Sequence, residues 1–184
     1  IADKEEVEKV LHYQVELLSL ITHLSTRFIH LPVEEIDSAL GIALGEIGRL
    51  LGVERCLIFD LRFQNKIYSS HEWHTEGIRS LRNQMQGVSA ELFPWGLKIL
   101  KQFKTLEVPD IEALPPEAWR EKAQWLELGI RSVLVVPMVW QNSLEGFISF
   151  DSATQTRHWR QEELQVLETF ANMLAQTLAR KAAE

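Results

Sequence analysis

The run LGIRSVLVVPMVWQNSLEGFISFDS, residues 128–152, carries the pattern that decides the fold. Two β-rich segments, 131–140 and 144–152, flank the turn-forming residues 141–143, which is typical of a β-hairpin. The segment 133–136 (Val-Leu-Val-Val) is apolar without alternation. We therefore expect a central strand that is covered on both of its faces.

The rest of the chain supplies a second hairpin and several helices around this one. A change from helical to alternating periodicity predicts strands at 55–63 and 66–74 around a Gln-Asn turn, whereas 78–92 has weak periodicity and is predicted to be a loop. The remaining predicted elements are helices at 4–29, 32–51, 94–103, 115–128 and 160–183 and a short strand at 105–108. Adjacent antiparallel hairpins with helices layered on the sheet predict an α+β fold.

Composition limits the classes of protein that this chain can belong to. Its 184 residues are 46% hydrophobic and 24% charged, which fits one globular domain. The net charge of −7 disfavours a nucleic-acid partner, and no apolar run approaches the ~20 residues that a membrane span needs. The chain opens without Met and closes on charged helical residues. We expect a single cytoplasmic domain, 1–184, excised from a longer chain.

Motifs that bring chemistry are missing from the sequence. The nine glycines are scattered, so neither a phosphate-binding loop nor a dinucleotide fingerprint is present, and there is no Gly-x-Ser-x-Gly nucleophile motif. Cys56 is the single cysteine and lies in a strand-like run, where a buried thiol is expected. We predict no catalytic residue and no enzyme activity for the domain.

His71, Glu72 and His74 are the closest group of metal-ligating residue types. Residues 71 and 74 differ by three on a predicted strand, so their side chains point to opposite faces. No further ligand is apparent for either face. We therefore predict no metal site, and His71 keeps a place only as a candidate pocket residue together with its face neighbour Trp73.

A ligand pocket is predicted between the sheet and the middle helices. Tryptophans cluster in those helices, and one face of the strand at 144–152 combines aromatic and polar residues, which suits a cavity lined by few polar groups. Core packing is the competing explanation for each aromatic residue. The candidate pocket residues are Phe59, His71, Trp73, Trp95, Trp119, Trp125, Phe147, Ser149 and Asp151.

The terminal helices have more apolar surface than a sheet can cover. The last helix has two apolar faces, of which one can cover the sheet and the other needs either the first two helices or a second subunit. We expect a homodimer through the terminal helices. The candidate dimer residues are Val7, Val10, Leu17, Ile21, Leu24, Phe28, Leu167, Leu174 and Leu178.

The chain resembles the GAF domains of bacterial sensor proteins over nearly its whole length. The stretches that carry the resemblance are 51–59, 71–78, 128–138, 144–152 and 157–159. The resemblance implies a central antiparallel sheet of about six strands with helices on both faces and long N- and C-terminal helices. It further implies an N-terminal signalling or dimer helix (1–31), a core (32–159) that encloses the pocket and a C-terminal helix (160–184).

The resemblance also implies a function. Members usually sense a small molecule and regulate an attached output domain, such as a histidine kinase, a response regulator or a diguanylate cyclase of a two-component system. The expected function is therefore small-molecule sensing that is passed on through the terminal helices. The alternative is a ligand-free dimerisation or spacer module between signalling domains.

Departures from the family's best-defined branches shape the cofactor prediction. Bilin-binding members carry a cysteine in the helix before the fourth strand, and the matching position, near Arg120, has no cysteine. The Asn-Lys-Phe-Asp-Glu signature of the cyclic-nucleotide branch does not fit, and the methionine sulfoxide reductase branch needs more cysteines than Cys56. We predict no cofactor and no covalent bilin, with an unknown small-molecule ligand.

Overall fold

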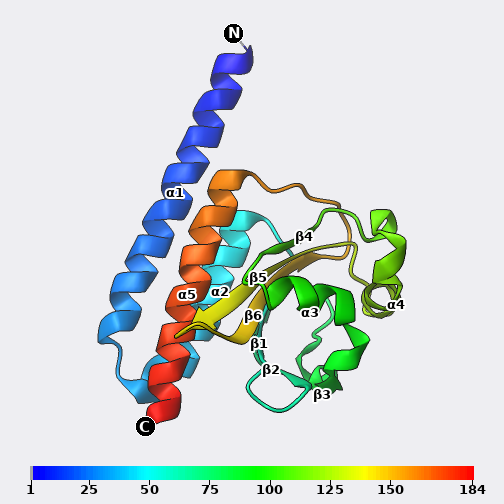
Figure 1. Ribbon diagram of the computed structural model, residues 1–184. Coiled ribbons are helices and arrows are strands. Elements are labelled where there is room, and N and C mark those ends of the chain that lie inside the picture. Colours follow the sequence, from blue (N-terminus) through cyan, green and yellow to red (C-terminus); the bar gives the residue numbers. More distant parts are fainter. Residues whose placement is uncertain (1) are drawn as a thin grey trace.

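A six-stranded antiparallel sheet lies between two layers of helices in the computed structural model, which describes residues 2–184 (Figure 1). The strands follow one another across the sheet in the order β3-β2-β1-β6-β5-β4. Their bounds are β1 Arg55–Asp60, β2 Lys66–His74, β3 Gln86–Ser89, β4 Leu106–Val108, β5 Ser132–Trp140 and β6 Ser143–Ser152. The two predicted hairpins thus form the middle of the sheet, where β1 pairs with β6.

Three long helices cover one face of the sheet and two short helices cover the other (Figure 1). The long helices are α1 (Ala2–His30), α2 (Ile36–Leu51) and α5 (Gln161–Ala183), and the short ones are α3 (Pro94–Leu100) and α4 (Trp119–Glu127). The N-terminal part of α1 projects beyond the rest of the molecule. This architecture confirms the predicted α+β class with helices on both faces.

The central strand β5 is buried on both faces, as its unbroken apolar run predicts. Leu134 and Val136 join the core beneath the long helices, whereas Val133 and Val135 join a second core beneath α3 and α4. Alternation along each strand divides the apolar side chains between these two cores. The sheet therefore separates the terminal helices from the interior beneath the short helices.

Helix α2 lies close to the sheet because it has glycines where it meets Trp73 of β2. A Cβ atom added at Gly45 would stand 3.0 Å from Trp73 Cδ1, and one at Gly48 would overlap the indole ring. The guanidinium of Arg49 lies 5.6 Å from the ring centroid, within reach of a cation–π interaction. Close packing, as expected for small residues along a helix, thus fixes Trp73 on the helical side of the sheet.

Polar contacts hold α1 to α5 at two places. The Tyr13 hydroxyl donates to Glu163 Oε2 (2.6 Å), near the start of α5. Near its end, Arg180 donates from Nη1 to the carbonyl of Leu31 and from Nη2 to the carbonyl of Phe28, both at 2.7 Å. The second contact satisfies carbonyls at the end of α1, which lack partners within the helix.

The structure differs from the sequence prediction in the lengths of the short helices α3 and α4, which are shorter than predicted, and in two strand segments. Strand β1 ends at Asp60, earlier than the predicted 63, because Asp60 pairs with Arg62 in the turn that follows. The predicted loop 78–92 contains β3, a short edge strand held by pairing with β2. Its Gly87, with φ of 69°, weakens the sequence signal for a strand.

Within residues 2–184, no helix is long and apolar enough to span a bilayer.

Candidate functional site

An apolar cavity lies between the sheet and the two short helices α3 and α4, here called the lid helices. Its volume is about 50 Å³. Residues of the sheet and of both lid helices line it, including Phe59 of β1, Val135 of β5, Leu97 of α3 and Trp125 of α4. Ser149 and Asp151 supply polar side chains, and the described lining residues include no Lys, Arg or His. The site therefore suits a mostly apolar ligand.

Strand alternation and aromatic stacking build the floor and the roof of this cavity. Phe59 and Phe147 stack with ring centroids 4.7 Å apart on neighbouring strands. Above them, Phe93 lies next to Trp125 with centroids 6.2 Å apart. Proline at the first position, Pro94, starts α3 directly after Phe93, because its fixed φ suits a helix start.

A buried ion pair forms the polar end of the cavity. Arg55 donates to both carboxylate oxygens of Asp151, from Nε at 3.1 Å and from Nη2 at 2.7 Å, and both side chains are almost fully buried. Its Nη1 donates to the carbonyl of Arg79 (2.6 Å), which fixes the β2–β3 connection. Burial raises the pKa of Asp151 to about 6, although the Arg55 charge opposes this shift.

The predicted pocket residues divide between the two faces of the sheet. Phe59, Trp125, Phe147, Ser149 and Asp151 line the cavity. Five residues from three elements, β1, α4 and β6, thus come together at one site, and the alternation of the strand at 144–152 led us to expect its three members there.

The remaining pocket candidates lie elsewhere. His71 and Trp73 face the long helices, where His71 Nε2 lies 2.8 Å from Asp37 Oδ1. Trp95 packs at the edge of the core beneath the lid helices without lining the cavity. Trp119 is 62% exposed, with the guanidinium of Arg120 at 4.9 Å from its ring centroid.

A β-bulge in β2 explains why His71 does not face the cavity. It interrupts the alternation of side chains between the two faces of the sheet. The β1–β2 register shifts between Ile58, which pairs with His71, and Phe59, which pairs with Ser69. Ser70 is the extra residue, so His71 faces the helices although Ile67, four residues before it on the same strand, lines the cavity. A register shift of this kind depends on the partner strand and leaves no mark in the sequence of β2 alone.

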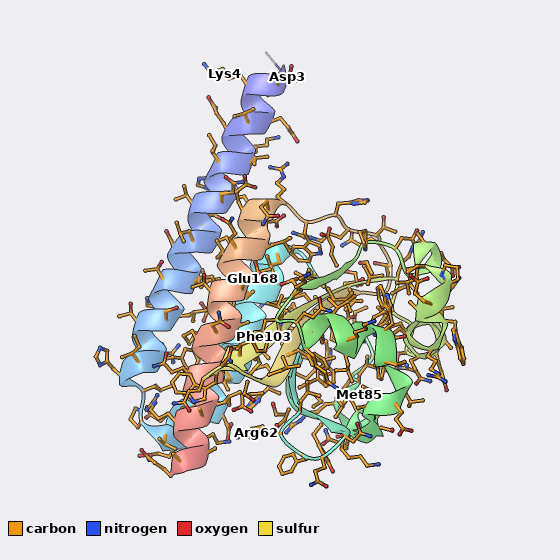
Figure 2. All side chains as sticks on the ribbon, in the orientation of Figure 1. Asp3, Lys4, Arg62, Met85, Phe103 and Glu168 are labelled. Atoms are coloured by element: carbon orange, nitrogen blue, oxygen red, sulfur yellow. The ribbon has the colours of Figure 1, made fainter. Side chains whose placement is uncertain are left out.

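Sequence reasoning missed cavity residues in the segment 78–92. Leu81 and Met85 are buried and line the cavity from this segment, and Figure 2 shows Met85 on the same side of the sheet as α3. Their spacing of four residues is the signal that could have identified them as facing one side. Leu57 and Ile67 were missed because their apolar strands offer no polar residue to attract notice.

Cys56 and the candidate metal ligands lie away from the cavity. Cys56 belongs to the core beneath the long helices, and burial raises the pKa of its thiol. His74 is exposed, with Nδ1 2.9 Å from the carbonyl of Thr75, and Glu72 accepts from the backbone of Leu81 at 2.7 Å. No three His, Cys, Asp or Glu side chains within residues 2–184 form a group that could hold a metal ion.

The candidate dimer residues are mostly inside the chain's own core. Those that are buried between the long helices and the sheet are Leu17, Ile21, Leu24, Phe28, Leu167 and Leu174. Val7 is exposed, and Val10 and Leu178 are half-buried. The buried face of α1 therefore packs on α5 of the same chain, and a second copy would have to use other residues.

The exposed apolar residues of α1 form a separate stripe. Val7, Leu11, Val15, Leu18 and Ile29 are each more than half exposed. Their spacings of four, four, three and eleven residues are close to whole helical turns, which places them on one side of the helix, next to its buried face. We call these five residues the α1 stripe.

An antiparallel sheet with an apolar cavity under two short helices and with long terminal helices on its far face defines a class of small α+β domains. The sequence profile described as the GAF domain matches residues 35–178. The chain belongs to the GAF domain family. No curated protein sequence matches it.

Solved structures with the same fold include several GAF domains that hold bilins. The phycocyanobilin-bound GAF domain of a cyanobacterial phytochrome has a TM-score of 0.71 at 18% identity, covering 91% of this chain and 94% of that one. The chromophore-binding domain of the bacteriophytochrome RpBphP3 from R. palustris has a TM-score of 0.76 at 16% identity, covering 93% and 62%. A far-red absorbing domain, JSC1_58120g3 with bound biliverdin, has a TM-score of 0.65 at 19% identity, covering 89% and 99%.

These comparisons correct the cofactor prediction. The sequence analysis predicted no cofactor and no covalent bilin, because a cysteine is absent near Arg120. Two of these domains are described as holding phycocyanobilin and biliverdin, respectively, and a further one as holding phycoerythrobilin. The prediction of no cofactor is therefore wrong by this comparison. That prediction rested on the missing cysteine alone.

Proposed function

We propose that this GAF domain is a cytoplasmic sensory module that binds a linear tetrapyrrole of the bilin class and regulates an attached output domain of a two-component protein. The observation that carries the proposal is the apolar cavity beneath the lid helices, which has an aromatic floor and roof and a buried carboxylate at one end. Such a lining suits a flat conjugated ligand that carries a few N–H groups.

The aromatic and polar lining residues suit the conjugated rings and N–H groups of a bilin, whereas the described lining holds no cation for its carboxylates. Phe59, Phe147 and Trp125 would contact its rings, and Asp151 and Ser149 would face its polar atoms. The cavity of about 50 Å³ is much smaller than the roughly 300–1,000 Å³ of ligand pockets, so the lid helices have to move away from the sheet during binding. A bound bilin would supply absorption of visible light.

A physical connection runs from the lid to a terminal helix. Thr105, shortly after α3, donates from Oγ1 to Glu168 Oε2 of α5 at 3.1 Å, and Figure 2 marks Glu168 on that helix. Because Leu97 and Leu100 of α3 line the cavity, a displaced lid would pull on this bond. A ligand changes such an equilibrium only through different affinity for the two arrangements.

Reconstitution with biliverdin tests the proposal. The purified domain should retain a long-wavelength absorption band after gel filtration. Ser149→Phe, which fills the cavity, should weaken binding at least tenfold, whereas Ser143→Phe, at the exposed start of the same strand, should bind like the wild type. A wild-type domain that stays colourless, or equal binding by both variants, contradicts the proposal and favours the ligand-free spacer.

We further propose that the module is a homodimer through its terminal helices. The α1 stripe is the exposed apolar surface that supports this, because apolar residues along one side of a long helix are typical of helix–helix association. Sedimentation should show a dimer that Leu18→Asp dissociates and that His23→Asp, on the polar side of α1, leaves intact. A dimer that survives Leu18→Asp places the interface elsewhere.

A further inference from the structure

Glu121 of α4 is a fully buried carboxylate. Among residues 2–184, only one of its two oxygens has a hydrogen-bond donor. Its exposed fraction is 0%. Oε2 accepts a hydrogen bond from the backbone N–H of Gly96 at 2.8 Å, whereas Oε1 is buried without a hydrogen-bond partner. Buried polar atoms are nearly always paired, so an exception calls for an explanation.

The described residues place no ion-pair partner beside Glu121. Among the ion pairs formed by residues 2–184, none includes this side chain. A buried carboxylate without a cation and with a free acceptor atom is costly, because burial removes its hydration. The missing partner is therefore expected to carry an N–H or O–H donor, and a positive charge would favour it further.

The position of Glu121 connects this missing partner with the cavity. Gly96, the residue that bonds to Oε2, is itself part of the cavity lining. A Cβ atom added at Gly96 would stand 3.7 Å from Glu121 Oε2 and 3.3 Å from Leu106 Cδ2, a further lining atom. Glu121, which is not itself part of the lining, is thus hydrogen-bonded to a residue that is.

We propose that Glu121 determines ligand specificity by accepting a hydrogen bond from an N–H donor of the cavity ligand. The ligand class is a flat, conjugated molecule with N–H groups, cationic when protonated, to which bilins with their pyrrole nitrogens belong. The proposal rests on the proposed function in that it assigns Glu121 to the same cavity. Since Glu121 joins α4 to α3 through Gly96, a ligand that engages it contacts both lid helices.

Two flat probes of similar size separate this role from simple apolar binding. Benzamidine carries N–H donors and a positive charge, whereas acetophenone has no donor. Calorimetric titration of the wild type should give a dissociation constant for benzamidine that is about tenfold lower than for acetophenone, as a charge-assisted hydrogen bond provides. Glu121→Gln and Glu121→Met should each bring this ratio close to one.

Glu127→Gln is the matched control, because it removes the same charge from an exposed position on the same helix and should keep the wild-type ratio. The inference is overturned if the wild type shows no preference for benzamidine, binds neither probe, or keeps its preference in both Glu121 variants. Thermal unfolding of each variant verifies that it is folded.

A biliverdin titration distinguishes this inference from the proposed function. Biliverdin that binds the wild type and Glu121→Gln equally well supports the bilin proposal and overturns the role of Glu121. Biliverdin that does not bind, together with a Glu121-dependent preference for benzamidine, overturns the bilin proposal and supports the role of Glu121. Both hold if Glu121→Gln weakens biliverdin binding about tenfold.

Discussion

Asp151 and Glu121 are the two carboxylates buried beside the cavity, and they differ in their partners. Asp151 has both oxygens paired with Arg55, whereas Glu121 has one oxygen without a partner. Asp151 was predicted from the sequence because it ends an amphipathic strand face. Glu121 was not predicted, because nothing in the sequence around a charged helix residue distinguishes a buried position from an exposed one.

The free energy of unfolding should depend on pH in mildly acidic solution because of Asp151. Its pKa is raised from 3.8 in the unfolded chain to about 6 in the fold, so the folded state binds the extra proton between these values. The contribution of Asp151 to stability is therefore full below pH 3.8 and is lost as the pH rises through 6. We expect the free energy of unfolding to exceed that of Asp151→Asn by more at pH 4.5 than at pH 7.

Urea unfolding of both proteins across this range measures the effect. At pH 7, where Asp151 is ionised, the variant should also be less stable, because it leaves Arg55 buried without its charge partner. A difference between the two proteins that stays constant from pH 4 to pH 7 would show that Asp151 has an ordinary pKa.

Secondary-structure elements were predictable where a local sequence pattern, such as the helical period or a glycine at a helix end, determines them. The long helices follow from the 3.6-residue period, and Gly52, with φ of 72°, ends α2 as its sequence position suggests. The edge strand β3 and the bulge at Ser70 were not predictable, because both depend on pairing with a neighbouring strand. The bulge alone moved His71 and Trp73 out of the predicted site.

Two glycine substitutions on α2 test the close contact between this helix and Trp73. Gly48→Ala should destabilise the domain by about 1–3 kcal/mol, because the new methyl group overlaps the indole ring. Gly41→Ala on the same helix has no atom within 4 Å and should stabilise it by about 0.5–1 kcal/mol. Chemical denaturation compares them, and a loss of stability that is equal in both would refute the packing explanation.

Arg180 should hold the ends of α1 and α5 together. Arg180→Ala removes both hydrogen bonds to the last carbonyls of α1 and should cost about 1–3 kcal/mol in unfolding free energy. Arg27→Ala, an exposed substitution on α1, is the control and should change stability by less than about 0.5 kcal/mol. Equal effects of the two substitutions would mean that the Arg180 contacts add no stability.

In the whole molecule, the sheet separates a cavity from a pair of terminal helices. The family and the layered architecture were predictable from the sequence, because hydrophobic patterns and the GAF resemblance extend over most of the chain. The face of the sheet on which each candidate pocket residue lies was predictable only within regular strands. The interior of the α1–α5 pair was assigned to a dimer, since sequence alone does not distinguish packing within one chain from packing between two.

The central claim is that a ligand beneath the lid helices changes the terminal helices on the other face of the sheet. Amide hydrogen exchange with and without biliverdin tests it most directly, with Ser149→Phe as the control. We predict slower exchange in α3 and α4 and altered exchange in α5 around Glu168 in the wild type alone. Protection limited to the lid helices, or exchange that biliverdin leaves unchanged throughout, would contradict the account.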